Sequence, residues 1–292
     1  MNDGGKWYQG FLHGFMIVLS LLTLFPFVLL LSGSLSDDNE IIRSGYAVIP
    51  KMLSFSAYEY LWSDAADIVR AYSITIFVTV VGTVAGLSII ALLSYPLSRR
   101  EMPFRGPLAF YVFFTMLFNG GLVPTYLVYT NMFDVKNSML ALLVPGLLMN
   151  AFYVILMRTF FATSIPPAII ESAYMDGAKE FRIFRSIIIP LSTPVLATVG
   201  LFQTIAYWND WFNGLIYITD PKLFSLQNLL NRILLDVQFL QTSQDSIAMG
   251  THIPLLSMRL AMAVIGIIPI LIAYPFFQKY FVKGITIGAV KG

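Results

Sequence analysis

The sequence predicts an all-α membrane protein with six transmembrane helices, and two observations support this fold class. Of the 292 residues, 57% are hydrophobic and only 12% are charged, whereas about a quarter of the residues in an ordinary soluble domain are charged. The chain also contains six long charge-free windows, and a helix crosses a bilayer core with about 20 apolar residues. A backbone in lipid must satisfy its own hydrogen bonds, which favours helices.

The six spans are expected at about residues 14–36, 71–98, 106–131, 137–160, 190–218 and 257–281, in one membrane domain that fills residues 1–292. The first is rich in Leu, Ile, Val and Phe, which outweigh Pro26, and it is too long for a signal peptide, so we expect it to be retained. The second is uninterrupted. The third has a polar break at 119–121, and the fifth carries amides, tryptophans and one acid.

Lysine and arginine set the orientation, because they gather on the cytoplasmic side of membrane proteins. If both termini are cytoplasmic, Arg99, Arg100 and Arg105 of one short loop lie on that side together with most of the other basic residues. We therefore expect both termini inside.

Three segments then lie outside, at 37–70, 131–136 and 219–258. In the last of them, apolar residues recur at helical spacing from Leu226 to Leu240, which predicts an amphipathic helix outside the bilayer. That helix either lies at the membrane interface or forms a docking surface for an external partner.

The longest polar stretch on the predicted cytoplasmic side is the loop at 161–190. Pro166 and Pro167 suit the start of a short helix. Gly177 permits a turn, and a second helix is expected after it, as far as Pro190.

An apolar stripe is expected along this second helix, formed by Phe181, Phe184 and Ile188 and packed against the chain's own helices. Basic residues recur at intervals of three on another face. On these residues alone, the segment is either a docking element for a protein partner or a linker helix lying on the inner leaflet.

Five residues of this loop match a known motif, namely Glu171, Ala173, Gly177, Ile187 and Pro190. Their spacing resembles the EAA loop of bacterial ABC importer permeases, which reads Glu-Ala-Ala, three residues, Gly, nine residues, then Ile, any residue, Leu and Pro. This chain departs from the motif at Ser172 and Ile189. In that family the loop is the coupling helix that fits a groove on the ATPase. The resemblance implies that the ATPase-coupling residues are Glu171, Ala173, Asp176, Gly177, Ala178, Lys179, Arg182 and Arg185.

The resemblance extends along the chain to carbohydrate-importer permeases of the maltose-transporter type, and to the smaller subunit that lacks an enlarged outer domain. It includes the tail FVKGITIGAVKG at 281–292 and the sequence WNDWFNGLIYI at 208–218. The sequence FNGGLVPTYLVYTN at 118–131 resembles the branch that handles complex or acidic oligosaccharides such as aldouronate, alginate or pectin fragments. The resemblance implies a type I ABC importer fold, one half of a translocation pore, and a multi-pass location in the bacterial cytoplasmic membrane.

The resemblance also implies partners. These are a second permease subunit, an ABC ATPase dimer, an extracytoplasmic solute-binding protein and a carbohydrate substrate, besides membrane lipid; no nucleic acid is expected. ATP and Mg are expected on the ATPase, because this chain has no G-x-x-x-x-G-K-[ST] phosphate loop. It also has no cysteine and only two, widely separated histidines, so we expect a non-catalytic subunit without a cofactor or metal of its own.

Polar residues at bilayer depth are candidates for the substrate pathway, because burying them in lipid is costly. The candidates are Asn119, Tyr207, Asn209, Asp210 and Asn213. Amides exchange hydrogen bonds with sugar hydroxyls, and aromatic rings cover apolar sugar faces. Asn209 and Asn213 are four residues apart and are expected to share one helical face. The alternative is that these residues hold helices together or form an interfacial belt, and that Asp210 pairs within the protein.

The alternative function is an ATP-independent channel or a secondary transporter. Ion-driven carriers usually place several ionisable groups in the membrane, whereas Asp210 is the one acid near the centre of a predicted span here. The sequence therefore favours a subunit that relies on a separate ATPase.

Overall fold

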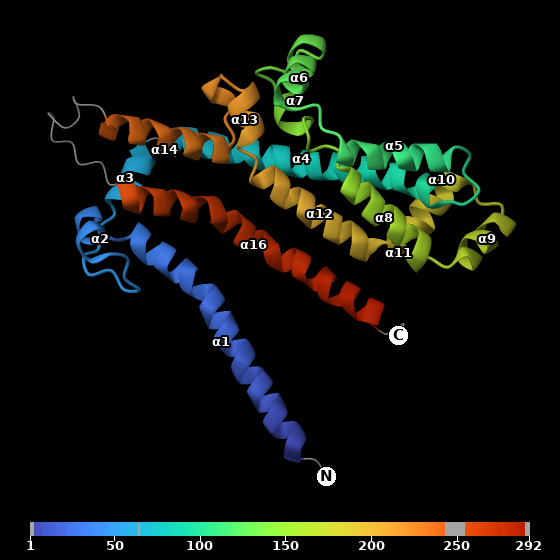
Figure 1. Ribbon diagram of the computed structural model, residues 1–292, viewed down its shortest axis with the longest axis horizontal. Helices are drawn as coiled ribbons and strands as arrows, with labels where there is room; N and C mark the ends of the chain where they lie inside the picture. Colours follow the sequence, from blue (N-terminus) through green and yellow to red (C-terminus); the bar gives the residue numbers. More distant parts are fainter. Residues whose placement is uncertain (1–2, 64, 243–254, 290–292) are drawn as a thin grey trace. The chain divides into compact units, whose positions relative to one another are not determined.

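A computed structural model describes residues 3–63, 65–242 and 255–289. The described chain is helical, apart from turns and an isolated bridge between Ser36 and Leu53 (Figure 1). It forms two compact units, one of Met1–Ala66 with Leu230–Pro269 and the other of Asp67–Leu229 with Ile270–Gly292. Most of the outer segment at 241–252 and the last three residues of the tail lie outside the described residues.

The first unit contains the long helix α1 (Asp3–Ser34) and two short helices, α2 (Asp38–Ser44) and α3 (Ser56–Ser63). It also holds most of α14 (Leu226–Thr242) and the beginning of α16 (Leu255–Ala289). The amphipathic helix predicted to begin at Leu226 is confirmed as a helix.

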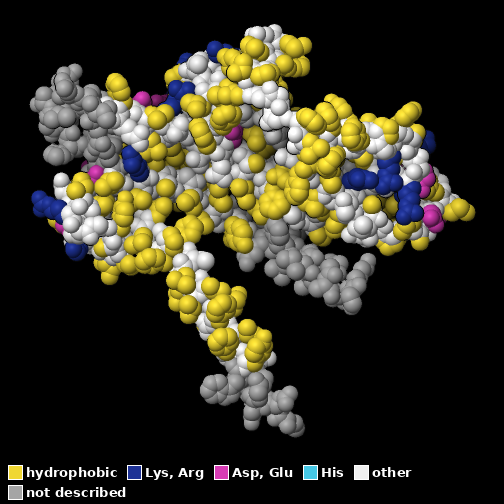
Figure 2. All heavy atoms as spheres, in the orientation of Figure 1, with side chains coloured by type: hydrophobic (Ala, Val, Ile, Leu, Met, Phe, Trp, Pro, Cys, Tyr) yellow, Lys and Arg dark blue, Asp and Glu magenta, His cyan; other side chains and the backbone are white. Residues whose placement is uncertain are grey.

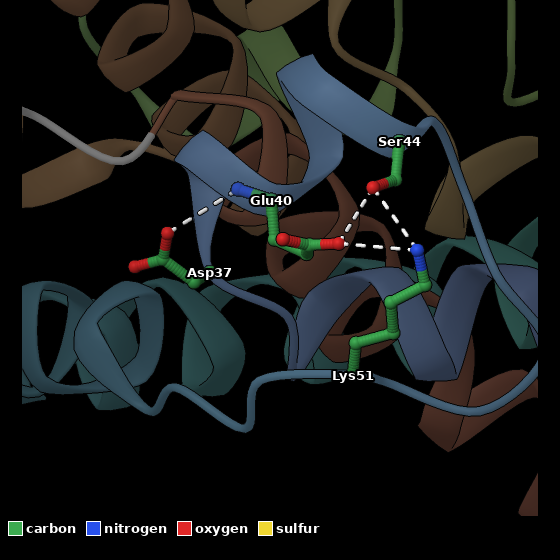
Figure 3. Close-up of polar contacts among 4 residues, drawn as sticks. All are labelled: Asp37, Glu40, Ser44 and Lys51. Carbon is green, nitrogen blue, oxygen red and sulfur yellow. Dashed lines mark hydrogen bonds and ion pairs between the residues drawn. The ribbon is translucent and has the colours of Figure 1, made fainter.

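Polar contacts shape the segment between α1 and α3 (Figure 3). Asp37 caps α2 by accepting a hydrogen bond from the Asn39 amide at 3.0 Å. Lys51 lies 3.4 Å from the Glu40 carboxylate, which also accepts a bond from Ser44 at 2.6 Å. The bond from Ser44 and the interaction with Lys51 lower the pKa of Glu40 below its ordinary value.

A carboxylate also joins this segment to the last helix of the same unit. Asp38 accepts hydrogen bonds from the amides of Leu256 and Ser257, at 3.0 and 2.9 Å, and from the Ser257 hydroxyl at 2.6 Å. Because an acid at a helix amino terminus meets free amides and the positive end of the dipole, this contact anchors the start of α16.

The second unit consists of a long helix followed by shorter ones. In chain order they are α4 (Ala65–Ser98), α5 (Arg105–Leu117), α6 (Leu122–Leu127), the π-turn Val128–Met132, α7 (Met139–Leu143), α8 (Ala151–Ser164), α9 (Pro167–Met175), α10 (Glu180–Ile183), the π-turn Phe184–Ile188, α11 (Ile189–Leu191), α12 (Thr193–Trp208), α13 (Phe212–Tyr217) and the 3₁₀ turn Pro221–Leu223.

Helices α4, α5, α8 and α12 run side by side and share one hydrophobic core (Figure 1). Fully buried members include Ile90 of α4 and Val154 and Met157 of α8. Glycine lets α4 approach its neighbours closely, because a Cβ at Gly86 would lie 2.1 Å from Gln203 Nε2 and 2.7 Å from the Leu148 carbonyl oxygen. The core continues into α9 and α10, which fixes the helix pair at one end of the bundle.

Two of the expected spans are continuous helices long enough to cross a membrane, at Tyr8–Ser34 and Ala65–Ser98. Three further candidates are bent pairs, with angles of 116° between α5 and α6, 76° between α8 and α9, and 79° before α12. A shorter apolar helix covers Leu256–Ile272. Within the expected spans 106–131, 137–160 and 190–218 the helix is interrupted, at 118–121, 144–150 and 209–211.

Candidate functional site

The segment at 161–190 folds as the helix pair that the sequence predicted. Helix α8 ends at Ser164, and Ile165 and Pro166 are extended, with ψ of 115° and 131°. The residue before a proline is driven out of the helical region, and Pro167 then starts α9 at its first turn. The chain therefore turns by 76° from α8 into α9.

The turn between the two helices is a Schellman motif around Gly177. The Ala178 amide donates to the Ala173 carbonyl and the Gly177 amide to the Tyr174 carbonyl, each at 2.9 Å. Gly177 has a φ of +74°, which L side chains rarely adopt. A Cβ built there meets no atom within 4 Å, so within this chain a substitution is penalised by backbone strain alone.

The second helix begins at Glu180 and continues through the π-turn Phe184–Ile188 to Leu191. Ile183 and Ile188, five residues apart, are 0% and 1% exposed because the wider π-turn brings them to one face. The predicted stripe is wrong for Phe181, which is 67% exposed. The expected end of this helix at Pro190 is also wrong, because the helix continues to Leu191.

The expected coupling residues divide into two groups. Ala173 is buried in the core and Ala178 is partly buried against it. The other six are exposed, namely Glu171, Asp176, Gly177, Lys179, Arg182 and Arg185. Figure 2 shows Lys and Arg side chains gathered over the end of the second unit that carries α9 and α10. This surface offers charge to a partner without disturbing the core.

A carboxylate that sequence reasoning missed ties the helix pair to α4. The Glu180 carboxylate accepts hydrogen bonds from the Tyr95 hydroxyl of α4 and from the Tyr174 hydroxyl of α9, one on each oxygen. The Arg99 guanidinium lies 5.9 Å from the Tyr174 ring centroid and 3.6 Å from the Glu101 carboxylate. No local pattern could reveal this cluster, because Tyr95 is 85 residues from Glu180.

The hydrogen bonds from the two tyrosines favour the ionised form of Glu180. Partial burial acts to raise the pKa of its carboxyl, but the bonds from Tyr174 and Tyr95 and the nearby Arg99 outweigh burial and lower the pKa below its ordinary value. Beside the cluster is a groove of about 740 Å³, lined by α4, by the loop at 99–103 and by the helix pair. The carboxylate is therefore ionised at neutral pH at the edge of a groove whose lining is apolar apart from Arg99, Glu101, Glu171 and the tyrosine hydroxyls.

The predicted pathway residues do not lie in one continuous helix. Asn119 is exposed at the bend between α5 and α6, where its side-chain oxygen accepts a bond from the Gly121 amide at 2.9 Å. Helix α12 ends at Trp208, and Asp210 accepts a bond from the Asn213 amide at 3.2 Å, which caps α13. The expected shared face of Asn209 and Asn213 is wrong, since the helix breaks between them.

Two of these residues donate hydrogen bonds to backbone carbonyls of an unwound segment inside the protein. Tyr207 is 2% exposed and donates to the Leu143 carbonyl at 2.8 Å. Asn213 is 7% exposed and donates to the Pro145 carbonyl at 2.9 Å. Together they pair carbonyls that the helix break at 144–150 would leave without partners. Asn209 is exposed and Asp210 partly exposed.

Comparison with known proteins is consistent with this architecture. The profile of the family described as "Binding-protein-dependent transport system inner membrane component" matches residues 2–287. The polygalacturonan/rhamnogalacturonan transport system permease protein YtcP of Bacillus subtilis is 36% identical over 282 residues, which cover 96% of this chain and 97% of that protein. The arabinooligosaccharides transport system permease protein AraQ of the same organism is 28% identical, over 95% of this chain and 94% of its own length.

Among solved structures, the chain is similar to one from a bacterial ABC transporter involved in the import of the acidic polysaccharide alginate. The TM-score is 0.78 at 29% identity, with 96% of this chain and 99% of that chain covered.

Proposed function

This chain belongs to the binding-protein-dependent transport system inner membrane component family, and from that premise we propose how it spans the membrane and which segments meet its partners. It is a non-catalytic permease subunit of an ABC importer for carbohydrate, in the bacterial inner membrane. We propose that six spans cross the membrane with both termini in the cytoplasm. The two long helices, the bent pair of α5 and α6, and the apolar helix Leu256–Ile272 support this arrangement, and α8 and α12 supply the membrane parts of the other two bent pairs.

The observation that carries the coupling role is the geometry of α9 and α10. Both helices turn away from their adjoining spans, by 76° and 79°. Their inner faces join the core, while Glu171, Lys179, Arg182 and Arg185 remain exposed. We propose that this pair docks in the groove of a separate ABC ATPase, which binds ATP and Mg.

The remaining partners are a second permease subunit, which completes the pore, and an extracytoplasmic binding protein. The exposed bend at Asn119 and the exposed Asn209 support a polar path between the two permeases, with Asp210 at its margin. One oxygen of the Asp210 carboxylate accepts a hydrogen bond from the Asn213 amide, which holds this side chain against the start of α13. We propose that the substrate is an acidic oligosaccharide, by similarity to the pectin-fragment and alginate transport proteins.

Site-specific photo-crosslinking tests the docking. A photoreactive residue at Met175, which is 88% exposed on α9, should crosslink the ATPase in native membranes. The same residue at Trp62, which is 80% exposed in the proposed outer segment, should not. Crosslinking of the ATPase from Trp62 and not from Met175 would refute the proposed orientation and docking together.

A further inference from the structure

We propose that Glu180, Tyr95, Tyr174 and Arg99 form a latch that makes α9, α10 and the adjoining end of α4 move as one body. The proposal rests on the coupling role given to the helix pair above. It names the positioning residues that pass a displacement of the loop to a membrane-spanning helix.

The connectivity of the latch is its first support. One carboxylate joins three elements, because the two Glu180 oxygens accept separately from Tyr95 on α4 and Tyr174 on α9 while Glu180 itself is on α10. Hydrogen bonds to an ionised acceptor are roughly twice as strong as neutral ones. Releasing α10 from α4 therefore breaks a charge-assisted contact.

The second support is the packing that accompanies the hydrogen bonds. Tyr95 is only 7% exposed, and its ring centroid lies 5.2 Å from that of Phe184 at an angle of 41°. Arg99 directly follows the last residue of α4, and its guanidinium lies 5.9 Å from the Tyr174 ring centroid. The ring contact and the guanidinium contact therefore hold α4 and the residue after it against both helices of the pair, beside the hydrogen bonds of Glu180.

The third support is the groove of about 740 Å³ beside the latch. Leu92 and Pro96 of α4 and Phe181 of α10 are among the apolar residues that line it. Apolar contact is non-directional and would let one helix slide or rotate on the other, whereas hydrogen bonds require a set distance and angle. On this side, the polar contacts fix the alignment of α10 on α4.

Distance measurement by electron spin resonance tests the latch. The chain has no cysteine, so spin labels can be placed cleanly at two introduced cysteines, Arg100→Cys and Ser186→Cys, which replace exposed residues at the end of α4 and on the π-turn after α10. In the purified complex with its ATPase, we expect a narrow distance distribution whose mean is the same with and without ATP and vanadate.

Tyr95→Phe removes one hydroxyl and keeps the packed ring. The population with the latch open should rise about tenfold, as for loss of a hydrogen bond to a charged group. The distribution should broaden, and its mean should shift with nucleotide. Glu180→Ala should do the same, and the double variant should be no worse than Glu180→Ala alone. Tyr111→Phe is the matched control, because its hydroxyl is exposed on α5 and makes no hydrogen bond found among the described residues; it should match the wild type.

A narrow, nucleotide-independent distribution in Tyr95→Phe would overturn the latch, as would a wild-type distance that shifts with nucleotide. Failure of the coupling role itself is detected separately. If the Gly177→Asp complex keeps full uptake, the loop does not couple. If Gly177→Asp loses uptake while Tyr95→Phe keeps the wild-type distribution, the latch alone is wrong.

Discussion

At the scale of single residues, ionisation of Glu180 is the property most open to experiment. Its pKa in the folded chain lies below the ordinary value of a glutamate, which applies when the chain is unfolded. A depressed folded pKa stabilises the fold above the unfolded pKa, and this contribution disappears as the pH falls through the folded pKa.

We therefore predict that Glu180→Gln lowers the melting temperature of the complex by a constant amount between pH 7 and about pH 5. The gap from the wild type should close as the pH falls through the lowered pKa of Glu180, where the wild-type carboxyl takes up a proton. Thermal unfolding of both proteins across this range checks the prediction. A gap that widens as the pH falls would contradict the assigned sign.

At the scale of elements, the unwound segment at 144–150 depends on side chains from α12 and α13. From α12, Tyr207 donates to the Leu143 carbonyl at 2.8 Å and Gln203 to the Leu148 carbonyl at 3.4 Å. From α13, Asn213 donates to the Pro145 carbonyl at 2.9 Å. Backbone groups without partners are costly at membrane depth, so such breaks persist where protein groups satisfy them.

We predict that Tyr207→Phe lowers the free energy of unfolding by about 1–3 kcal/mol, because it leaves the partly buried Leu143 carbonyl without the hydroxyl that donates to it. Denaturant or thermal unfolding in detergent measures the change. Tyr111→Phe, which removes an exposed hydroxyl from α5, should change stability by less than about 0.5 kcal/mol. Equal changes in the free energy of unfolding for the two substitutions would show that the hydrogen bond from Tyr207 does not stabilise the fold.

Some of the helices and helix breaks could be predicted from the sequence, and others could not. The helix pair was predictable because Pro166, Pro167 and Gly177 act locally, through fixed φ angles and a left-handed turn. The break after Trp208 and the unwound segment were not, because they depend on hydrogen bonds to residues more than 50 positions away. The exposed charges of the loop were likewise predictable from the local sequence. The contact between Tyr95 and Glu180 was not, because it joins residues 85 positions apart.

At the scale of the whole molecule, the chain supplies a pore half and leaves ATP hydrolysis to another subunit, and we propose that its loop at 161–190 is the docking segment. Uptake should therefore require the ATPase and an intact turn at Gly177. Asp at this position strains a backbone held at a φ of +74° and adds a side chain that meets nothing within the chain. Its effect on uptake reports the fit to the partner.

ATP-driven uptake of an oligogalacturonate into vesicles that contain the reconstituted complex is the most direct test. We predict uptake by the wild type with ATP and none without it. Uptake should be lost in Gly177→Asp although the protein inserts and folds, and retained in Gly106→Asp, where a Cβ also meets no atom within 4 Å. Wild-type uptake by Gly177→Asp, or uptake by this chain alone without ATP, would contradict the account.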